Sequence, residues 1–157
     1  HVGLLATEGT VKSQSYDMEI HKLWPDIKVT GQACPFWVPL VEYNEADSPG
    51  ADYFVKKRID QLLRKDPEID SIILGCTHFP LLMPKILKYT PPGITIVPQG
   101  EYVASKLKDY LRRHPEMETL LTKGGDVKYF STENASKFMA SASIFLHERI
   151  KATHIDL

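Results

Sequence analysis

Short apolar runs alternate with longer amphipathic stretches along the chain. Apolar runs rich in β-branched residues predict strands, whereas apolar residues that recur with the helical period predict helices. The predicted strands are Val2–Ala6, Lys28–Gln32, Ser71–Leu74, Ile94–Val97 and Val127–Ser131. The predicted helices are Thr10–Trp24, a helix with its apolar face over Ala51–Leu63, Leu81–Tyr89, Tyr102–Arg113 and Ala135–Ile150. This alternation favours an α/β fold with a mostly parallel open sheet flanked by helices.

Ser71–Leu74 is the clearest strand, and Cys76 follows it directly. Ligands of open α/β sheets bind at the carboxyl ends of the strands. Gly75 is expected to allow a tight turn, and Pro80 suits the first turn of a helix. A thiol at that place would lie near the positive end of a helix dipole and near His78, and both would lower its pKa. Such a thiolate could act as a nucleophile or as a base.

Each candidate residue also has an ordinary structural interpretation. Cys76 could simply fill the core, as buried cysteines often do. Thr7 and Thr10 lie after the first strand and could hold a substrate carboxylate or merely cap a helix. Glu42 could pair with His78 or remain a solvated surface residue. Cys34 is expected to be structural, because nothing near it in the sequence would stabilise a thiolate.

Composition narrows the function classes. The chain has 157 residues, a formal net charge of −1, 43% hydrophobic residues and two cysteines. Near-neutral charge gives no basic face for a nucleic acid or a membrane surface, and no apolar stretch approaches the ~20 residues of a membrane span. Cys34 and Cys76 lack metal-ligand spacing, so we expect no metal site. Two reduced thiols are typical of a cytoplasmic protein.

Three ordered motifs resemble the bacterial glutamate racemases. The run from Ile73 to Leu82, which contains Gly75-Cys76-Thr77-His78, closely resembles the second cysteine motif of that family. Leu5–Tyr16 resembles its threonine-rich turn, and Ala33–Glu42 resembles a third landmark. The later part matches more loosely, through Gln99-Gly100-Glu101 and the helix from Ala135.

The resemblance implies a two-base mechanism without pyridoxal phosphate, metal or any other cofactor. Two cysteines would flank the α-carbon of glutamate, with Cys76 as the base or acid on one face. His78 and Glu42 would tune its protonation, while Thr77, Thr7 and Thr10 would bind substrate or line the pocket. Related aspartate racemases usually carry an acidic residue at the position of His78, which favours glutamate. The D-glutamate product would serve peptidoglycan synthesis in the cytoplasm.

One departure from the family concerns the other catalytic cysteine, which the resemblance places in an N-terminal α/β half. No such motif is present here, and Cys34 aligns with a non-catalytic segment. The chain therefore resembles the C-terminal portion of a longer enzyme. We expect residues 1–93 to form one complete lobe and residues 94–157 to return to a second lobe. The chain alone should be inactive, and the full-length enzyme should be a homo-oligomer.

Two other functions remain open from the sequence. Cys76 and His78 could serve a nucleophilic hydrolase or acyl transferase, although residues two apart in one turn rarely align as nucleophile and base, and no third orienting group is obvious. A cysteine phosphatase is disfavoured because Leu82 stands where that class needs an arginine. A non-catalytic module that binds a small ligand is the third possibility.

Overall fold

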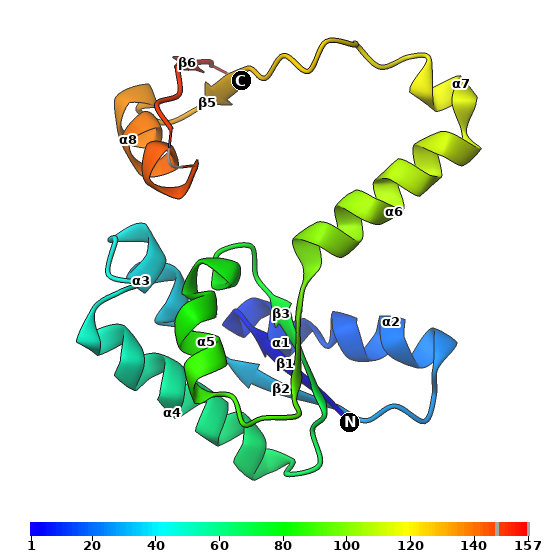
Figure 1. Cartoon of the computed structure of the whole chain (residues 1–157), viewed down its shortest axis with the longest axis vertical. Helices are drawn as coiled ribbons and strands as arrows, with labels where there is room; N and C mark the ends of the chain where they lie inside the picture. Colours follow the sequence, from blue (N-terminus) through cyan, green and yellow to red (C-terminus); the bar gives the residue numbers. More distant parts are fainter. Residues whose placement is uncertain (147, 157) are drawn as a thin grey trace. The chain divides into compact units, whose positions relative to one another are not determined.

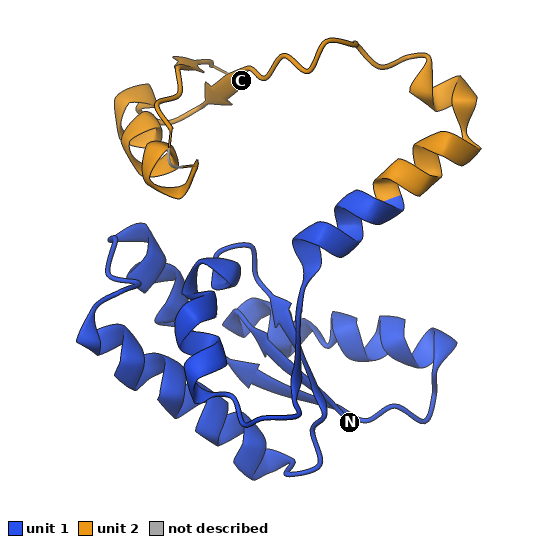
Figure 2. Cartoon of the chain, in the orientation of Figure 1, with its two compact units in different colours: residues 1–106 blue, residues 107–157 orange. Residues whose placement is uncertain are grey.

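The computed structural model describes residues 1–146 and 148–156. They divide into two compact units, residues 1–106 and residues 107–157 (Figure 2). Each unit is considered by itself below. Among the described residues, no helix combines the length and the apolar character that crossing a bilayer requires.

Unit 1 is built on a four-stranded parallel sheet in the order β2-β1-β3-β4 (Figure 1). Its strands are β1 (Val2–Ala6), β2 (Val29–Ala33), β3 (Ser71–Gly75) and β4 (Thr95–Pro98). This confirms the predicted α/β fold with a mostly parallel sheet. In the register, Ala6 of β1 lies opposite both Ala33 of β2 and Gly75 of β3. Three strands therefore end at the same edge of the sheet.

The helices of unit 1 follow the predicted order, with differences in where they begin and end and with one additional α-helix. They are α1 (Glu8–Ser13), α2 (Ser15–Leu23), α3 (Trp37–Glu42), α4 (Pro49–Lys65), the 3₁₀ turn η1 (Phe79–Leu82), α5 (Met83–Tyr89) and α6 (Gln99–Arg113), which continues into unit 2. The single helix predicted over 10–24 is divided at Gln14, whose backbone is left-handed with φ 52°. Helix α3 was not predicted. Pro39 is tolerated there because it lies in the first turn, where no backbone N–H has an intrahelical acceptor.

The core of unit 1 lies between α4 and the sheet. Ser48 caps α4 by accepting a hydrogen bond from the Ala51 amide, and Pro49 follows at the first helical position. The helix buries one face in the predicted pattern, and the sheet contributes matching aliphatic residues. The buried side chains on this face are Ala51, Val55, Ile59 and Leu62 of α4 with Leu5, Ile72 and Leu74 of the strands.

Asp52 connects α4 to α5 through three hydrogen bonds. Its carboxylate accepts from Lys85 Nζ at 2.6 Å, Lys88 Nζ at 2.9 Å and the Tyr89 hydroxyl at 2.6 Å. The bond from Lys85 is the largest cause that holds the pKa of Asp52 well below its ordinary value, followed by those from Tyr89 and Lys88. Asp52 therefore fixes α5, the helix that follows the Cys76 turn.

The substitution Asp52→Asn is expected to destabilise unit 1 in a pH-dependent way. Because the pKa of Asp52 is lowered on folding, its contribution is complete above about pH 4, the ordinary range of the unfolded group. The contribution is lost as the pH falls through the folded pKa. Urea unfolding at pH 7 and pH 3 should show a large difference between wild type and variant at pH 7 and a smaller one at pH 3. Asp60→Asn is the control, because the Asp60 carboxylate pairs with Lys56 on the exposed side of α4. An equal loss there would contradict the prediction.

Unit 2 combines the end of α6 with α7 (Pro115–Glu118), β5 (Tyr129–Ser131), α8 (Ala135–Leu146) and β6 (Ala152–His154). Strands β5 and β6 pair in parallel, with Phe130 opposite Thr153. The strand predicted from Val127 begins two residues later, and β6 was not predicted. Helix α8 ends at Leu146 rather than at Ile150; within the predicted span, residue 147 lies outside the described residues.

The predicted boundary after Gly93 falls inside unit 1. Strand β4 pairs with β3 over Ser71–Leu74, so the first sheet includes residues beyond Gly93. The boundary between the two compact units lies instead after Lys106. The assignment of the later residues to a second lobe of a longer enzyme stays a prediction, and it now concerns unit 2.

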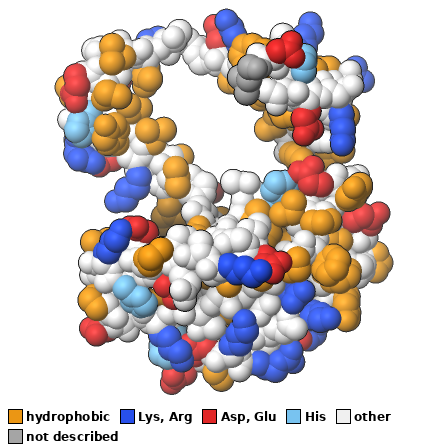
Figure 3. All heavy atoms as spheres, turned by 180° about the vertical axis from the view of Figure 1, so that it is seen from behind, with side chains coloured by type: hydrophobic (Ala, Val, Ile, Leu, Met, Phe, Trp, Pro, Cys, Tyr) orange, Lys and Arg blue, Asp and Glu red, His pale blue; other side chains and the backbone are white. Residues whose placement is uncertain are grey.

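Hydrophobic side chains reach the surface of both units (Figure 3), and on α6 they include Tyr102, Val103, Leu107 and Tyr110.

Candidate active site

Cys76 emerges from the end of β3, next to the end of β1. Gly75 is needed here because of a close approach between strands, not because of a turn with positive φ. A Cβ on Gly75 would lie 2.9 Å from the Ala6 Cβ and 2.9 Å from the Leu4 Cδ1. Because Ala6 and Gly75 are register partners, Thr7 and Cys76 follow them on neighbouring strands. The predicted meeting of these segments at one edge of the sheet is therefore observed.

His78 lies between the Cys76 thiol and the Glu42 carboxylate. The Cys76 Sγ is 3.9 Å from His78 Nδ1, and His78 Nε2 is 2.5 Å from Glu42 Oε1. Glu42 is the last residue of α3, and His78 directly precedes η1. The carboxylate can accept the proton of Nε2, which leaves Nδ1 free to exchange a proton with the sulfur. The three groups can thus move a proton to and from a partly exposed thiol.

Two buried aromatic rings hold α3 against the Cys76 turn. Trp37 begins α3 and Phe79 begins η1, and both side chains are fully buried. Their ring centroids are 4.7 Å apart, and Trp37 Nε1 donates to the Phe54 carbonyl oxygen at 3.4 Å. Glu42 ends α3, and His78 directly precedes η1. The contact between Trp37 and Phe79 therefore sets the distance between the carboxylate and the imidazole.

The threonines are arranged as a helix cap and as an exposed turn residue. Thr7 is the N-cap of α1, where its Oγ1 accepts from the Thr10 amide at 3.4 Å and lies 2.9 Å from the Thr10 Oγ1. Thr7 therefore caps the helix, and both threonines are half-buried. Thr77 is exposed beside Cys76. The geometry leaves all three available to a ligand without assigning them a role.

Cys34 is placed in the core. Its side chain is fully buried, and its Sγ lies 3.5 Å from the Gln32 carbonyl oxygen. Burial raises the pKa of the Cys34 thiol to about 12, which keeps it protonated at neutral pH. Cys76 is partly exposed. The two cysteines thus have opposite environments, as the sequence interpretation of Cys34 requires.

The expected helix after Cys76 begins later than predicted. A 3₁₀ turn over Phe79–Leu82 comes first, and the α-helix α5 starts only at Met83. The dipole of an α-helix acts within its first turn. The proposed stabilisation of a Cys76 thiolate by a helix N-terminus is therefore not supported, and His78 is the group that the structure places near the sulfur.

Gln99 was not singled out as a site residue, yet its side chain contacts the strand that carries Cys76. Its Nε2 donates to the Leu74 carbonyl oxygen at 2.9 Å and lies 2.5 Å from the Tyr16 hydroxyl. Strand β4 ends at Pro98, so this side chain adds one hydrogen bond to β3 beyond the last strand pair. The only sequence signal was the weak motif match around Gln99, because periodicity carries no information about such a contact.

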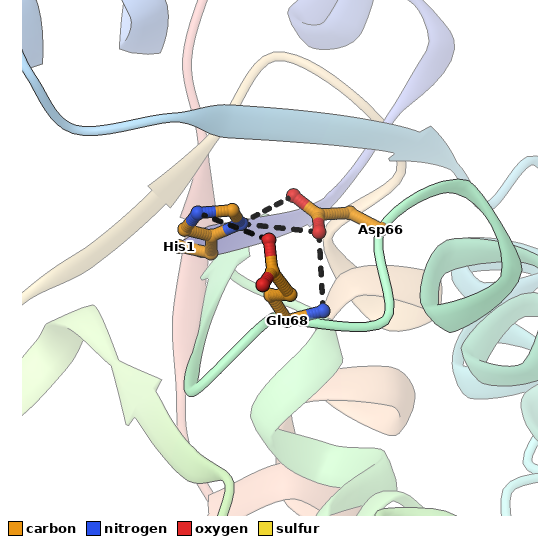
Figure 4. Close-up of side chains that lie close together, drawn as sticks. All are labelled: His1, Asp66 and Glu68. Carbon is orange, nitrogen blue, oxygen red and sulfur yellow. Dashed lines mark hydrogen bonds and ion pairs between the residues drawn. The ribbon is translucent and has the colours of Figure 1, made fainter.

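A second polar cluster lies where the strands begin. His1, Asp66 and Glu68 approach one another (Figure 4), with His1 Nδ1 3.0 Å from one Asp66 oxygen and Nε2 3.6 Å from Glu68. Lys28 Nζ is 3.1 Å from the same Asp66 oxygen, and Thr30 also donates to it. A lysine ammonium already neutralises the buried carboxylate, so these groups form an ion-pair network that attaches the end of α4 to the sheet.

Fold and site together define a protein with an open parallel α/β sheet and a partly exposed cysteine at the carboxyl ends of its strands. This cysteine contacts a histidine, which in turn contacts a glutamate. No family profile matches the chain. The chain is 37% identical over 157 residues to a glutamate racemase of Lactiplantibacillus plantarum. The alignment covers 99% of this chain and 57% of that enzyme. It is 38% identical over 150 residues to a glutamate racemase of Ruegeria, covering 96% of the chain and 54% of that enzyme.

Solved structures give the same relationship. A glutamate racemase isoform from Bacillus anthracis matches with a TM-score of 0.87 and 32% identity, over 99% of this chain and 57% of that one. The Francisella tularensis glutamate racemase in complex with D-glutamate matches with a TM-score of 0.80 and 25% identity, over 99% of this chain and 56% of that one. The chain is a homologue of the glutamate racemases that aligns with their C-terminal part. It spans little more than half the length of these relatives.

Proposed function

We propose that this chain carries one half of a glutamate racemase active site, with Cys76 as one of two proton-transfer groups. The observation that carries the proposal is the partly exposed Cys76 thiol at the carboxyl edge of a parallel sheet. The thiol lies next to His78, and His78 is hydrogen-bonded to Glu42. The similarity to glutamate racemases over nearly the whole chain supports this assignment. So does the structural match to a relative that was solved with D-glutamate.

In the proposed reaction, the thiolate of Cys76 removes the α-proton of one glutamate enantiomer, or its thiol returns a proton to the same face. His78 exchanges that proton with the sulfur through Nδ1, while Glu42 orients the imidazole through Nε2. Thr7, Thr10 and Thr77 supply hydroxyls to the substrate carboxylate or ammonium at the strand ends. The mechanism needs no pyridoxal phosphate and no metal ion.

The second proton-transfer group belongs, in this proposal, to the part of the relatives that the chain does not cover. A single thiol can exchange the α-proton on one face only, so the 157 residues alone should not racemise glutamate. The complete enzyme would act in the cytoplasm, as a homo-oligomer, and would supply D-glutamate for peptidoglycan.

Exchange of the α-hydrogen of glutamate in deuterated water tests the proposal. The complete protein, without added cofactor, should incorporate deuterium into both enantiomers, as followed by proton NMR and circular dichroism. Cys76→Ser should abolish racemisation and leave exchange only on the face that the second group serves, so that deuterium no longer enters both enantiomers, whereas Cys34→Ser, which alters a buried thiol, should retain the wild-type exchange if the protein stays folded. Absence of exchange in the folded complete protein, or full exchange in Cys76→Ser, would contradict the proposal.

One observation favours a second candidate function. The sequence offered no third group to orient His78, but the structure places Glu42 against its Nε2. A cysteine, histidine and carboxylate in series are also the components of a nucleophilic hydrolase or acyl transferase. A covalent acyl adduct on Cys76, detected by mass spectrometry after incubation with activated esters and absent in Cys76→Ser, would support that reaction instead. A small-ligand module would bind glutamate without any α-hydrogen exchange.

A further inference from the structure

A hollow with a basic lining lies beside the edge strand of the sheet, between β2 and the second half of α4. Its volume is about 440 Å³, which is within the range of sites for small molecules. The lining residues are Gln32, Arg58, Gln61, Arg64 and Lys65. The proposed racemase mechanism uses none of them.

Three positive charges line this hollow, and no carboxylate does. Arg58 donates to Gln61 Oε1 at 2.9 Å, and Lys65 Nζ donates to the Gly31 carbonyl oxygen at 2.8 Å, so both contacts are with neutral groups. The guanidinium of Arg64 has no hydrogen-bond or ion-pair partner within residues 1–146 and 148–156. By contrast, Lys56 of α4 is paired with Asp60, and Lys85 of α5 is paired with Asp52. The chain as a whole has a net charge of −1, so this excess of positive charge is local.

Gln32 gives the hollow a fixed polar wall. Its side chain is only 6% exposed, and its Nε2 donates to the Ala33 carbonyl oxygen and to Gln61 Oε1. These bonds turn the amide of Gln32 toward α4, and Gln61 in turn accepts from Arg58. The guanidinium of Arg58 is therefore held in one orientation before any ligand arrives, which reduces the entropy lost on binding.

Two comparisons separate this hollow from an ordinary solvated surface. Arg64 and Lys65 lie in the last turn of α4, where cations favourably oppose the helix dipole, but this does not account for Arg58 or the buried Gln32. A second hollow of about 400 Å³, between α6 and α7, is lined by Leu111, Pro115 and Glu118 together with two cations. Of these two hollows, the one at α4 combines several cations with an orienting amide and has no acid in its lining.

We propose that the hollow between β2 and α4 binds the phosphate group of a small phosphorylated molecule. Guanidinium groups bind phosphate oxygens through paired, charge-assisted hydrogen bonds, and Lys65 adds a further positive charge. The volume leaves room for more than a single phosphate, so pyrophosphate is expected to bind more tightly than inorganic phosphate. The site is independent of the Cys76 chemistry, and its test does not require racemase activity.

Isothermal titration of the 157-residue chain with sodium pyrophosphate, at constant ionic strength set by sodium chloride, tests this proposal. We expect saturable binding, with inorganic phosphate weaker. Arg64→Gln removes the cation that has no partner and should raise the dissociation constant about tenfold, the usual cost of losing one charge-assisted hydrogen bond. Lys57→Gln is the matched control, because it removes one charge from the same helix outside the hollow and should change the constant less than twofold.

Three outcomes would overturn the proposal. Absence of saturable pyrophosphate binding to the folded chain would show that the hollow is ordinary solvated surface. Equal weakening by Arg64→Gln and Lys57→Gln would show diffuse attraction to the helix rather than a site. Much tighter binding of a single-stranded oligonucleotide, with a steep dependence on salt, would assign the surface to nucleic acid instead.

Discussion

Under native conditions, a thiol reagent is expected to modify Cys76 and to leave Cys34 unmodified. Only the thiolate reacts, and burial raises the pKa of the Cys34 thiol to about 12, so its thiolate fraction at pH 8 is on the order of one in ten thousand. Full burial of Cys34 also excludes the reagent. The rates for the two cysteines should therefore differ by at least about a thousandfold. Iodoacetamide labelling followed by peptide mass spectrometry measures both rates in one sample.

Two variants and one denatured sample make this labelling result decisive. Cys34→Ala should keep one rapidly labelled thiol, and Cys76→Ala should lose it. In concentrated urea the wild-type chain should show two labelled cysteines. Rapid labelling of Cys34 in the folded chain would mean that β2 and α3 open readily, and it would remove the basis for treating Cys76 as the one accessible thiol.

Trp37→Ala is expected to cost about 3–5 kcal/mol of stability, the range measured for truncation of buried large aromatic residues. Trp37 is fully buried against Phe79, and its Nε1 hydrogen bond to the Phe54 carbonyl oxygen would also be lost. The chain's other tryptophan, Trp24, is 58% exposed at the end of α2, so Trp24→Ala should change stability by less than about 0.5 kcal/mol. Urea unfolding followed by circular dichroism compares the two variants.

A second pair of variants, Trp37→Phe and Trp37→Ala, tests how the site is held together. Since Trp37 packs α3 against the turn that contains His78, Trp37→Phe should retain more of the Glu42–His78 contact than Trp37→Ala. The NMR chemical shifts of the His78 ring protons, compared at one fixed pH, should therefore be close to wild type in Trp37→Phe and altered in Trp37→Ala, at temperatures where both are folded. Similar unfolding free energies for Trp37→Ala and Trp24→Ala would contradict the assigned core.

The strands of the first sheet could be predicted because they are short apolar runs bounded by polar residues or glycine. The pairing of Glu42 with His78 was one of two alternatives that the sequence left open, and the structure shows the contact, although these residues are far apart in the sequence. Helix α3 was not predicted, because Pro35 and Pro39 indicate irregular structure. Proline is compatible with a helix only in its first turn, and the sequence does not show where this helix begins. The bulky Trp37, which fixes that helix by tertiary contact, gives no local signal of its partner.

Other differences also arise from contacts that sequence periodicity does not contain. The boundary after Gly93 was inferred from a breaker sequence, but hydrogen bonds between β3 and β4 keep the next strand in the first sheet. Gln99 was missed because its role depends on the Leu74 carbonyl oxygen and the Tyr16 hydroxyl. Strand β6 is only three residues long, too short for an alternating pattern to be recognised.

Gly75 has a consequence for how this protein can diverge. A single added methyl group would press on the Ala6 Cβ and the Leu4 Cδ1 and would tend to separate β1 from β3. Thr7 and Cys76 follow those two strands, so the spacing between a hydroxyl-bearing turn and a thiol-bearing turn would change with it. Substitution is thus restricted at a position that has no side chain. The exposed Thr77, two residues further on, can be exchanged without disturbing the core and is the freer position on which selection for a new substrate could act.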